Sequence, residues 1–213
     1  MTKGVFLDRD GVINRKPPEG DYITRREDLQ ILPGVIEGIA QLNRAGFRVI
    51  VVTNQRCVAK GLMTAVDLEL MHEGMLEFLV QAGATIDGIY YCPHEIEPVC
   101  RCRKPAPGML LQAAREHGIE LRASWMIGDS ESDIEAGKNA GCKTARLGAV
   151  KAAGRETESG PAPSVSADIF APSLLNAIGQ ILEREKAAAE SFAVADTVHG
   201  MFQDARVEAK RGL

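Results

Sequence analysis

Short runs of consecutive apolar residues alternate along this chain with longer stretches in which apolar residues recur every three or four positions. Consecutive apolar residues are typical of strands that are buried on both faces, as in a parallel sheet. The runs predict strands over residues 4–7, 48–53, 86–91, 124–127 and 143–147, with a weaker one over residues 167–170.

The stretches between these strands have the apolar spacing of packed helices. Val35, Ile39 and Leu42 fall on one helical face, and Gly46 follows them as a stop signal. Further helices are predicted over residues 65–82, 109–116, 132–140 and 173–190.

Strands that alternate with helices at this spacing indicate βαβ units, and therefore a Rossmann-like, doubly wound α/β domain on a parallel sheet. We expect this domain to span residues 1–183. Residues 149–166 are rich in Ala, Gly, Pro and Ser, and they predict a surface loop within it. For residues 184–213 two alternatives remain: an additional helix, packed on the domain or on a partner, and a frayed tail.

Composition excludes several classes of protein. The chain has 213 residues, of which 45% are apolar and 25% are charged, as in ordinary globular proteins. Its net charge of −4 argues against a general binder of nucleic acids or of anionic membranes. No apolar run approaches the roughly 18 residues of a membrane span. The first predicted strand begins at Gly4, which leaves no room for a signal peptide, so we expect a cytoplasmic protein.

Polar side chains that can do chemistry come directly after the predicted strands. Asp8 and Asp10 follow the first strand, and Gly11 allows a sharp turn after them. A carboxylate pair in this place could hold a hard cation such as Mg²⁺, or divide the roles of nucleophile and general acid. The alternative is a solvated turn, in which Asp and Gly are common for conformational reasons.

Other candidate residues follow other strands of the predicted sheet. Thr53 offers a hydroxyl and nearby backbone N–H groups to a phosphate. Lys104 ends a short basic run suited to phosphate oxygens, although a solvated basic loop would have the same composition. Asp129 ends the fourth strand, and Asp133 follows one helical turn later. Right-handed crossovers bring all strand ends to one edge of the sheet, where open α/β sheets bind ligands, and this convergence favours a functional site.

Taken in order, these residues resemble the four motifs of the haloacid-dehalogenase (HAD) phosphatase superfamily: Asp-x-Asp-Gly-Val, a strand-end threonine, Lys-Pro and Gly-Asp-x-x-x-Asp. More narrowly, Asp-Arg-Asp-Gly-Val-Ile-Asn, Thr-Asn-Gln and Cys-Pro-His…Cys-x-Cys-Arg-Lys-Pro resemble the D-glycero-D-manno-heptose 1,7-bisphosphate 7-phosphatase group. The histidinol-phosphate phosphatases share this layout. The resemblance covers about residues 3–182 and implies a HAD fold with a minimal cap.

The resemblance also implies a mechanism. Asp8 would attack phosphorus to form a phosphoaspartate, and Asp10 would protonate the leaving alkoxide and later activate water. Mg²⁺ would draw the anionic nucleophile and the phosphate together. The implied catalytic residues are Asp8, Asp10, Thr53 and Lys104, and the implied Mg²⁺ ligands are Asp8, the Asp10 carbonyl and Asp129, with Asp133 as a ligand or an orienting residue.

A cluster of cysteines predicts a second metal site. Three thiolates and one imidazole are the ligand set of a closed structural Zn²⁺ site, and their spacing matches the loop of the family. A disulfide is a poor alternative, because Cys-x-Cys closes an awkward ring and the expected compartment is reducing. Zinc would fold a loop that delivers Arg103 and Lys104 to the pocket. The expected ligands are Cys92, His94, Cys100 and Cys102.

These motifs imply a phosphatase of small molecules that removes the 7-phosphate of a heptose 1,7-bisphosphate. A histidinol-phosphate or other small sugar-phosphate phosphatase, a phosphotransferase or mutase, and a binding module without activity remain as alternatives. The sequence leaves the oligomeric state open. A bisphosphate needs cationic groups beyond the reacting phosphate, and Arg15 and Lys16 lie in a loop that could add to them. The expected substrate contacts are Arg9, Asn54, Gln55, Arg56, Arg103 and Ser130.

Overall fold

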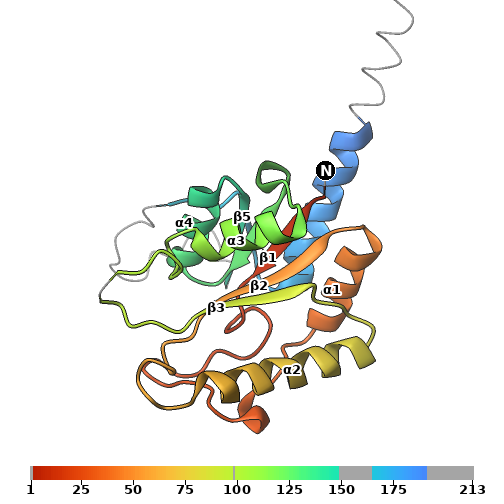
Figure 1. Cartoon of the computed structure of the whole chain (residues 1–213). Helices are drawn as coiled ribbons and strands as arrows, with labels where there is room; N and C mark the ends of the chain where they lie inside the picture. Colours follow the sequence, from red (N-terminus) through yellow and green to blue (C-terminus); the bar gives the residue numbers. More distant parts are fainter. Residues whose placement is uncertain (1, 98, 149–164, 191–213) are drawn as a thin grey trace, which may run out of the picture. The chain divides into compact units, whose positions relative to one another are not determined.

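The computed structural model describes residues 2–97, 99–148 and 165–190 (Figure 1). Its centre is a parallel sheet of six strands in the order β3-β2-β1-β4-β5-β6. The strand order reverses on either side of β1, as in doubly wound folds, and the predicted α/β class is confirmed. The strands are β1 (Gly4–Leu7), β2 (Arg48–Asn54), β3 (Gly88–Cys92), β4 (Trp125–Gly128), β5 (Lys143–Leu147) and β6 (Ile169–Ala171).

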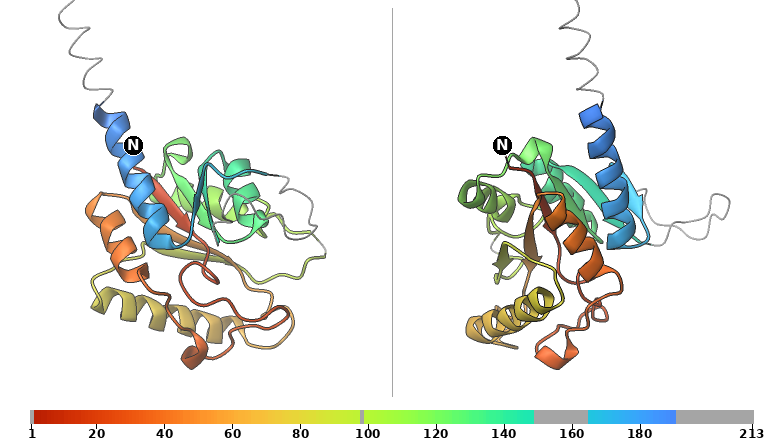
Figure 2. Two further views of the ribbon diagram at one scale, coloured as in Figure 1. Left: turned by 180° about the vertical axis from the view of Figure 1, so that it is seen from behind. Right: turned by 90° about the vertical axis from the view of Figure 1, so that its right-hand side faces the viewer.

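Helices cover both faces of the sheet, α3 and α4 on one face and α1 on the other (Figure 2). α2 connects β2 to the edge strand β3. The helices are α1 (Val35–Arg44), α2 (Ala65–Gln81), α3 (Gly108–His117) and α4 (Glu131–Ala140), with 3-10 turns η1 (Arg26–Asp28) and η2 (Leu121–Ala123).

One apolar core cluster lies between the sheet and the helices α3 and α4. Phe6, Ile50 and Met126 come from the three central strands, and their side chains are fully buried. Met109 and Leu110 of α3 belong to the same cluster. Because side chains alternate along a strand, the neighbouring residues of the same strands face the opposite side of the sheet. Both faces are therefore apolar, which explains the uninterrupted apolar runs of the sequence.

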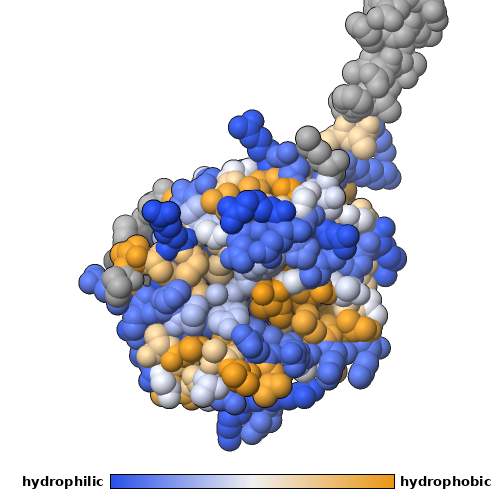
Figure 3. All heavy atoms as spheres, viewed as in Figure 1, coloured by the Kyte–Doolittle hydropathy of each residue, from blue (hydrophilic) through white to orange (hydrophobic). Residues whose placement is uncertain are grey.

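A second apolar cluster holds α2 against the loops that follow β1 and β2. Leu68 and Met71 of α2 pack with Ile23, Cys57 and Met63. The opposite side of α2 exposes several apolar residues, and Figure 3 shows apolar atoms among polar ones where Figure 1 places this helix. No helix among the described residues is long and apolar enough to cross a membrane.

The structure follows the predicted elements closely, and several strand ends differ from their predicted positions by one or two residues. β1 and β5 have their predicted bounds, whereas β3 begins at Gly88 and not at Ile86. Asp87 lies before β3 and binds to β2 at the point where these two strands begin to pair. Its carboxylate accepts a 2.8 Å hydrogen bond from the Val49 N–H, and its own N–H donates to the Val49 carbonyl.

The chain divides into two units, Met1–Ile178 and Gly179–Leu213. In the first unit, residues 174–178 are helical, and in the second the described residues 179–190 are helical as well. Most of the predicted loop over residues 149–166 and the tail beyond residue 190 lie outside the described residues. The boundary at residue 183 therefore stays a prediction.

Candidate active site

Two carboxylates meet where the central strands β1 and β4 end. The strands pair with Leu7 opposite Ile127, and the next N–H, that of Asp8, donates to the Ile127 carbonyl at 3.0 Å. Asp8 and Asp129 therefore leave the same edge of the sheet side by side. Oxygens of these two residues and of Asp133 lie within 4.8 Å of one another.

Glycines make this close approach of carboxylates feasible. Gly11 has a φ of +89°, and a Cβ atom there would collide with the Asp129 carboxylate. A Cβ atom at Gly128 would likewise overlap the Asp133 side chain. The turn after β1 and the end of β4 thus need residues without a side chain.

A buried ammonium lies among these carboxylates. Lys104 Nζ donates to Asp8 Oδ1 at 2.7 Å and to the Val52 carbonyl at 2.8 Å. It also forms an ion pair with Asp133 Oδ1 at 2.6 Å. Burial alone would lower the pKa of Lys104, but Asp133 and Asp8 outweigh it and raise that pKa, so the side chain carries a positive charge.

The donor set at this edge fits a divalent cation. Burial raises the pKa of Asp8 to about 7, against the opposing effect of Lys104, so a further positive charge beside Asp8 would favour its ionised form. Within the described part of the chain, Asp129 Oδ1 is buried and accepts no hydrogen bond. Carboxylate oxygens are the ligands that Mg²⁺ takes in proteins. Asp8 and Asp129 are therefore suitable ligands, and the Asp10 backbone carbonyl stays a predicted third ligand. Lys16 Nζ lies 2.7 Å from the other oxygen of Asp129.

Asp10 lies in a separate network of donors. Asn14 Nδ2 donates to its Oδ1 at 2.9 Å and Gln55 Nε2 donates to its Oδ2 at 3.0 Å. The Arg9 guanidinium contacts both carboxylate oxygens. Burial would raise the pKa of Asp10, but Arg9 and the hydrogen bonds from Asn14 and Gln55 outweigh it and lower that pKa.

The structure places the predicted substrate contacts in different surroundings. Arg9 is fully buried behind Asp10, so the structure does not bring its guanidinium to a surface that a substrate reaches. Asn54 exchanges two 3.1 Å hydrogen bonds with the backbone of Lys104 and fixes the loop that carries it. Ser130 caps α4 through the Asp133 carboxylate. Gln55 also donates to the buried Thr53 hydroxyl at 2.9 Å.

The predicted zinc ligands come together in the loop after β3. The Sγ atoms of Cys92, Cys100 and Cys102 lie 3.3–3.5 Å apart, and His94 Nδ1 lies 3.3 Å from the Cys102 sulfur. These separations exceed the roughly 2.05 Å of a disulfide bond. They approach the edge of a tetrahedron with metal–sulfur bonds of about 2.3 Å, which is about 3.8 Å. The donor set and its spacing therefore fit Zn²⁺.

This cysteine loop is tied to the loop after β2. Glu95 of the cysteine loop forms an ion pair with the guanidinium of Arg56, which is one of the predicted substrate contacts. The Ala59 N–H donates to the Pro93 carbonyl at 3.1 Å. Arg103 Nη1 donates to the His94 carbonyl at 3.4 Å, one residue before Lys104. A metal in the loop would thus stabilise the backbone that carries the buried ammonium.

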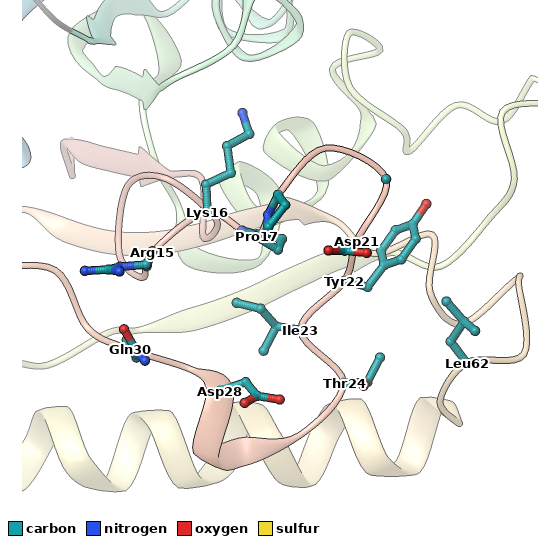
Figure 4. Close-up of a pocket in the computed structure, with 12 residues that line it drawn as sticks. Arg15, Lys16, Pro17, Asp21, Tyr22, Ile23, Thr24, Asp28, Gln30 and Leu62 are labelled. Atoms are coloured by element: carbon teal, nitrogen blue, oxygen red, sulfur yellow. The ribbon is translucent and has the colours of Figure 1, made fainter.

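Two cavities border the loop after β1, and one of them is lined by the site residue Asp129. One of about 680 Å³ is lined by Asp129, Gly11 and apolar residues such as Leu147. The other, of about 520 Å³, lies in the loop after β1, and Figure 4 shows the Ile23 and Tyr22 side chains among those that line it. Arg15 and Lys16 line both cavities and bring positive charge to them.

Comparison with known proteins decides the family. The HAD-hydrolase-like family model matches residues 101–177. A D-glycero-beta-D-manno-heptose-1,7-bisphosphate 7-phosphatase from Helicobacter pylori (strain J99) is 42% identical over 143 residues, which are 67% of this chain and 80% of that protein. The chain belongs to the HAD-like hydrolase family. The resemblance predicted from the four motifs is thereby confirmed.

Further relatives agree with this family. An enzyme of the same name from Rhodopseudomonas palustris is 43% identical over 64% of this chain and 78% of its own length. A crystal structure of D,D-heptose 1,7-bisphosphate phosphatase from B. bronchiseptica, complexed with magnesium and phosphate, superposes with a TM-score of 0.73 at 30% identity. The match covers 86% of this chain and 99% of the B. bronchiseptica chain.

The sequence did not indicate two residues of the site. Asn14 is the last residue of the motif Asp-Arg-Asp-Gly-Val-Ile-Asn, and this place in the motif is the signal that could have identified it. His72 lies 3.1 Å from Arg9 Nη1, but a single histidine in a helix with apolar spacing carries no such signal.

Proposed function

We propose that this chain is a Mg²⁺-dependent phosphomonoester hydrolase that acts through a phosphoaspartate on Asp8. The observation that carries the proposal is the arrangement of Asp8 beside Lys104 and Asp129, with Asp10 held apart by its own donors. Asp8, Asp129 and the Asp10 carbonyl would hold Mg²⁺, which supplies positive charge between an anionic nucleophile and an anionic phosphate.

The first half-reaction uses Asp8 and Asp10 in different roles. Asp8 Oδ1 accepts the Lys104 hydrogen bond, and the other carboxylate oxygen forms a bond to phosphorus. The bond between phosphorus and the sugar oxygen breaks, and Asp10 donates its proton to that oxygen. Lys104 stabilises charge on the transferring group.

The second half-reaction regenerates the enzyme. Water attacks the phosphorus of the phosphoaspartate, Asp10 takes the proton, and the bond from phosphorus to Asp8 breaks to release inorganic phosphate. The lowered pKa of Asp10 favours the carboxylate that this step needs. A phosphate dianion beside Asp10 raises its pKa, because like charges favour the neutral form, and this favours the acid for the first step.

The proposed substrate is D-glycero-D-manno-heptose 1,7-bisphosphate, which loses its 7-phosphate. Relatives that carry this name at about 42% identity support the choice. The cavity beside Asp129 and the cavity in the loop after β1 support it as well, because Arg15 and Lys16 line both and offer charge to a second phosphate. Arg103, which follows the cysteine loop, is a further candidate for this contact.

We propose structural zinc for the cysteine loop and a cytoplasmic location. Four ligands with no open position suit a site that folds a loop and takes no part in chemistry. The described cysteines form no disulfide, which agrees with a reducing compartment.

A substrate panel with Mg²⁺ tests the proposal. Phosphate release would be compared by kcat/KM for both anomers of heptose 1,7-bisphosphate, histidinol phosphate, fructose 1,6-bisphosphate and p-nitrophenyl phosphate. We expect the highest value for a heptose bisphosphate. A preference for histidinol phosphate would overturn the substrate, transfer of phosphate to a sugar without release would indicate a mutase, and no turnover of any ester would overturn the enzyme class.

A further inference from the structure

The guanidinium of Arg9 divides its donors between two partners inside the protein. One edge contacts Asp10, with Nε 3.2 Å and Nη2 3.0 Å from Oδ1, and Nη2 also 3.0 Å from Oδ2. The remaining terminal nitrogen, Nη1, lies 3.1 Å from His72 Nε2. Arg9 is fully buried and His72 is 5% exposed, so water does not substitute for either partner.

The chemistry of these groups fixes the state of the histidine. Arginine has only donors, so His72 Nε2 must accept the hydrogen bond, and the ring is neutral with its proton on Nδ1. Burial and the Arg9 charge lower the pKa of His72 to about 3, in agreement with a neutral ring. Tyr91 of β3 packs edge-on against this ring, with 5.8 Å between the centroids, and restricts its position.

We propose that His72 is a positioning residue that acts through Arg9 to hold the Asp10 carboxylate in place for proton transfer. Because Asp10 and Arg9 are adjacent in the chain, two flexible side chains alone would not define the carboxylate plane. His72 anchors the far end of the guanidinium to α2, and Asn14 and Gln55 complete the set of donors around Asp10. The proposal rests on the proposed function, in which Asp10 is the acid and base.

Esters with different leaving groups distinguish a positioning role of His72 from a merely structural one. A misplaced acid slows the departure of a poor leaving group, such as a sugar alkoxide, but hardly affects a nitrophenolate, which leaves without a proton. A general loss of packing would slow all esters alike. The quantity to measure is kcat/KM, because it reports the steps up to phosphoryl transfer and excludes the hydrolysis of the phosphoenzyme.

The test compares His72→Leu with His72→Gln, whose amide oxygen can accept from Arg9. The esters would run from p-nitrophenyl phosphate to alkyl and sugar phosphates. For His72→Leu we expect a loss in kcat/KM of about 10-fold or more for alkyl esters, the size of one lost hydrogen bond to a charged group, and a loss of about 2-fold or less for p-nitrophenyl phosphate. His72→Gln should recover most of the loss. His117→Leu, the same change at a histidine bonded to Tyr90 on the edge of the sheet, is the matched control.

Burst kinetics, in which the first turnover is faster than the later ones, would be further evidence of a displaced base. With p-nitrophenyl phosphate, His72→Leu should release one equivalent of p-nitrophenol rapidly and then turn over slowly, because Asp10 also activates the water of the second step. Equal losses for all esters, unchanged kinetics, or unfolding of both His72 variants in a thermal melt would overturn the positioning role. A wild-type enzyme that hydrolyses no ester would overturn the proposed function itself.

Discussion

The ammonium of Lys104 lies 2.7 Å from Asp8 Oδ1, although 96 positions separate the two residues in the chain. Lys104 also contacts the Val52 carbonyl at the end of β2, so it connects two strands and the loop before α3. It is 4% exposed. The same charge therefore serves the fold, by neutralising buried carboxylates, and the proposed reaction, by stabilising the transferring phosphoryl group.

Replacing Lys104 should damage both of these roles. We expect Lys104→Met to lower kcat by about 10²–10³-fold, the cost of one lost donor to developing charge, with little change in KM. It should also lower the free energy of unfolding by about 3–5 kcal/mol, because Asp8 and Asp133 lose their buried partner. Lys138→Met, at an exposed position of α4, is the control for the loss of a lysine. Full activity of Lys104→Met would contradict its place beside the phosphate.

Substitutions at Gly11 and Gly20 test the proposed cation site, with Gly20 as the control position. Both have left-handed backbone, with φ of +89° and +88°, but only at Gly11 would a Cβ atom meet Asp129, whereas nothing lies within 4 Å at Gly20. Substitution by Ala should destabilise either turn by about 1–2 kcal/mol. Only Gly11→Ala should also weaken Mg²⁺ binding, measured by calorimetry in the absence of substrate. Equal Mg²⁺ affinity of the two variants would show that the turn does not position Asp129.

The cysteine loop makes a prediction about metal content. Protein purified without chelator should contain about one Zn²⁺ per chain, and Cys100→Ser should lower this content because a ligand of the tetrahedral set is lost. The variant should raise KM and lower kcat together, since the loop carries Arg103 and Lys104.

Cys142→Ser is the control for this change. Cys142 is a buried thiol whose pKa burial raises to about 12, and it lies outside the metal-ligand cluster. The Cys142→Ser variant should have a somewhat lower free energy of unfolding and should keep its zinc. Zinc-free wild-type protein with normal kinetics would contradict a structural metal.

His72 should make stability depend on pH. Its ordinary pKa of 6.5 applies to the unfolded chain, whereas in the folded protein burial and Arg9 lower it to about 3, with Asp10 opposing and Tyr91 packed on the ring. The unfolded chain therefore binds the proton first as pH falls, and the contribution of His72 to stability, present above pH 6.5, is lost below it.

The measurement compares wild type with His72→Gln, which has no titrating ring. The difference in the free energy of unfolding, wild type minus variant, should decrease by about 1.4 kcal/mol for each pH unit below 6.5, towards pH 4. Other carboxylates titrate in both proteins and cancel. A difference that is constant from pH 7 to pH 4 would contradict a buried neutral histidine.

Sequence patterns predicted the fold and the meeting of Asp8 with Asp129 because both depend on local rules. Apolar runs define strands, and parallel pairing brings Asp8 and Asp129 to one edge, whatever else the chain does. The surroundings of Asp10 depend instead on how α2 packs. The letters Asp-Arg-Asp do not say that Arg9 turns inward, and nothing near His72 in the sequence indicates its partner 63 positions away.

The most direct test of the central claim is detection of the phosphoryl group on Asp8. Asp10→Asn, incubated with p-nitrophenyl phosphate and Mg²⁺, lacks the base for hydrolysis and should accumulate a phosphoenzyme that mass spectrometry locates on Asp8. Asp8→Asn should keep the fold, take up no phosphate and release none, because the amide is nearly isosteric but a poor nucleophile. Substantial phosphate release by Asp8→Asn, or a phosphoryl group found on another residue, would contradict the account.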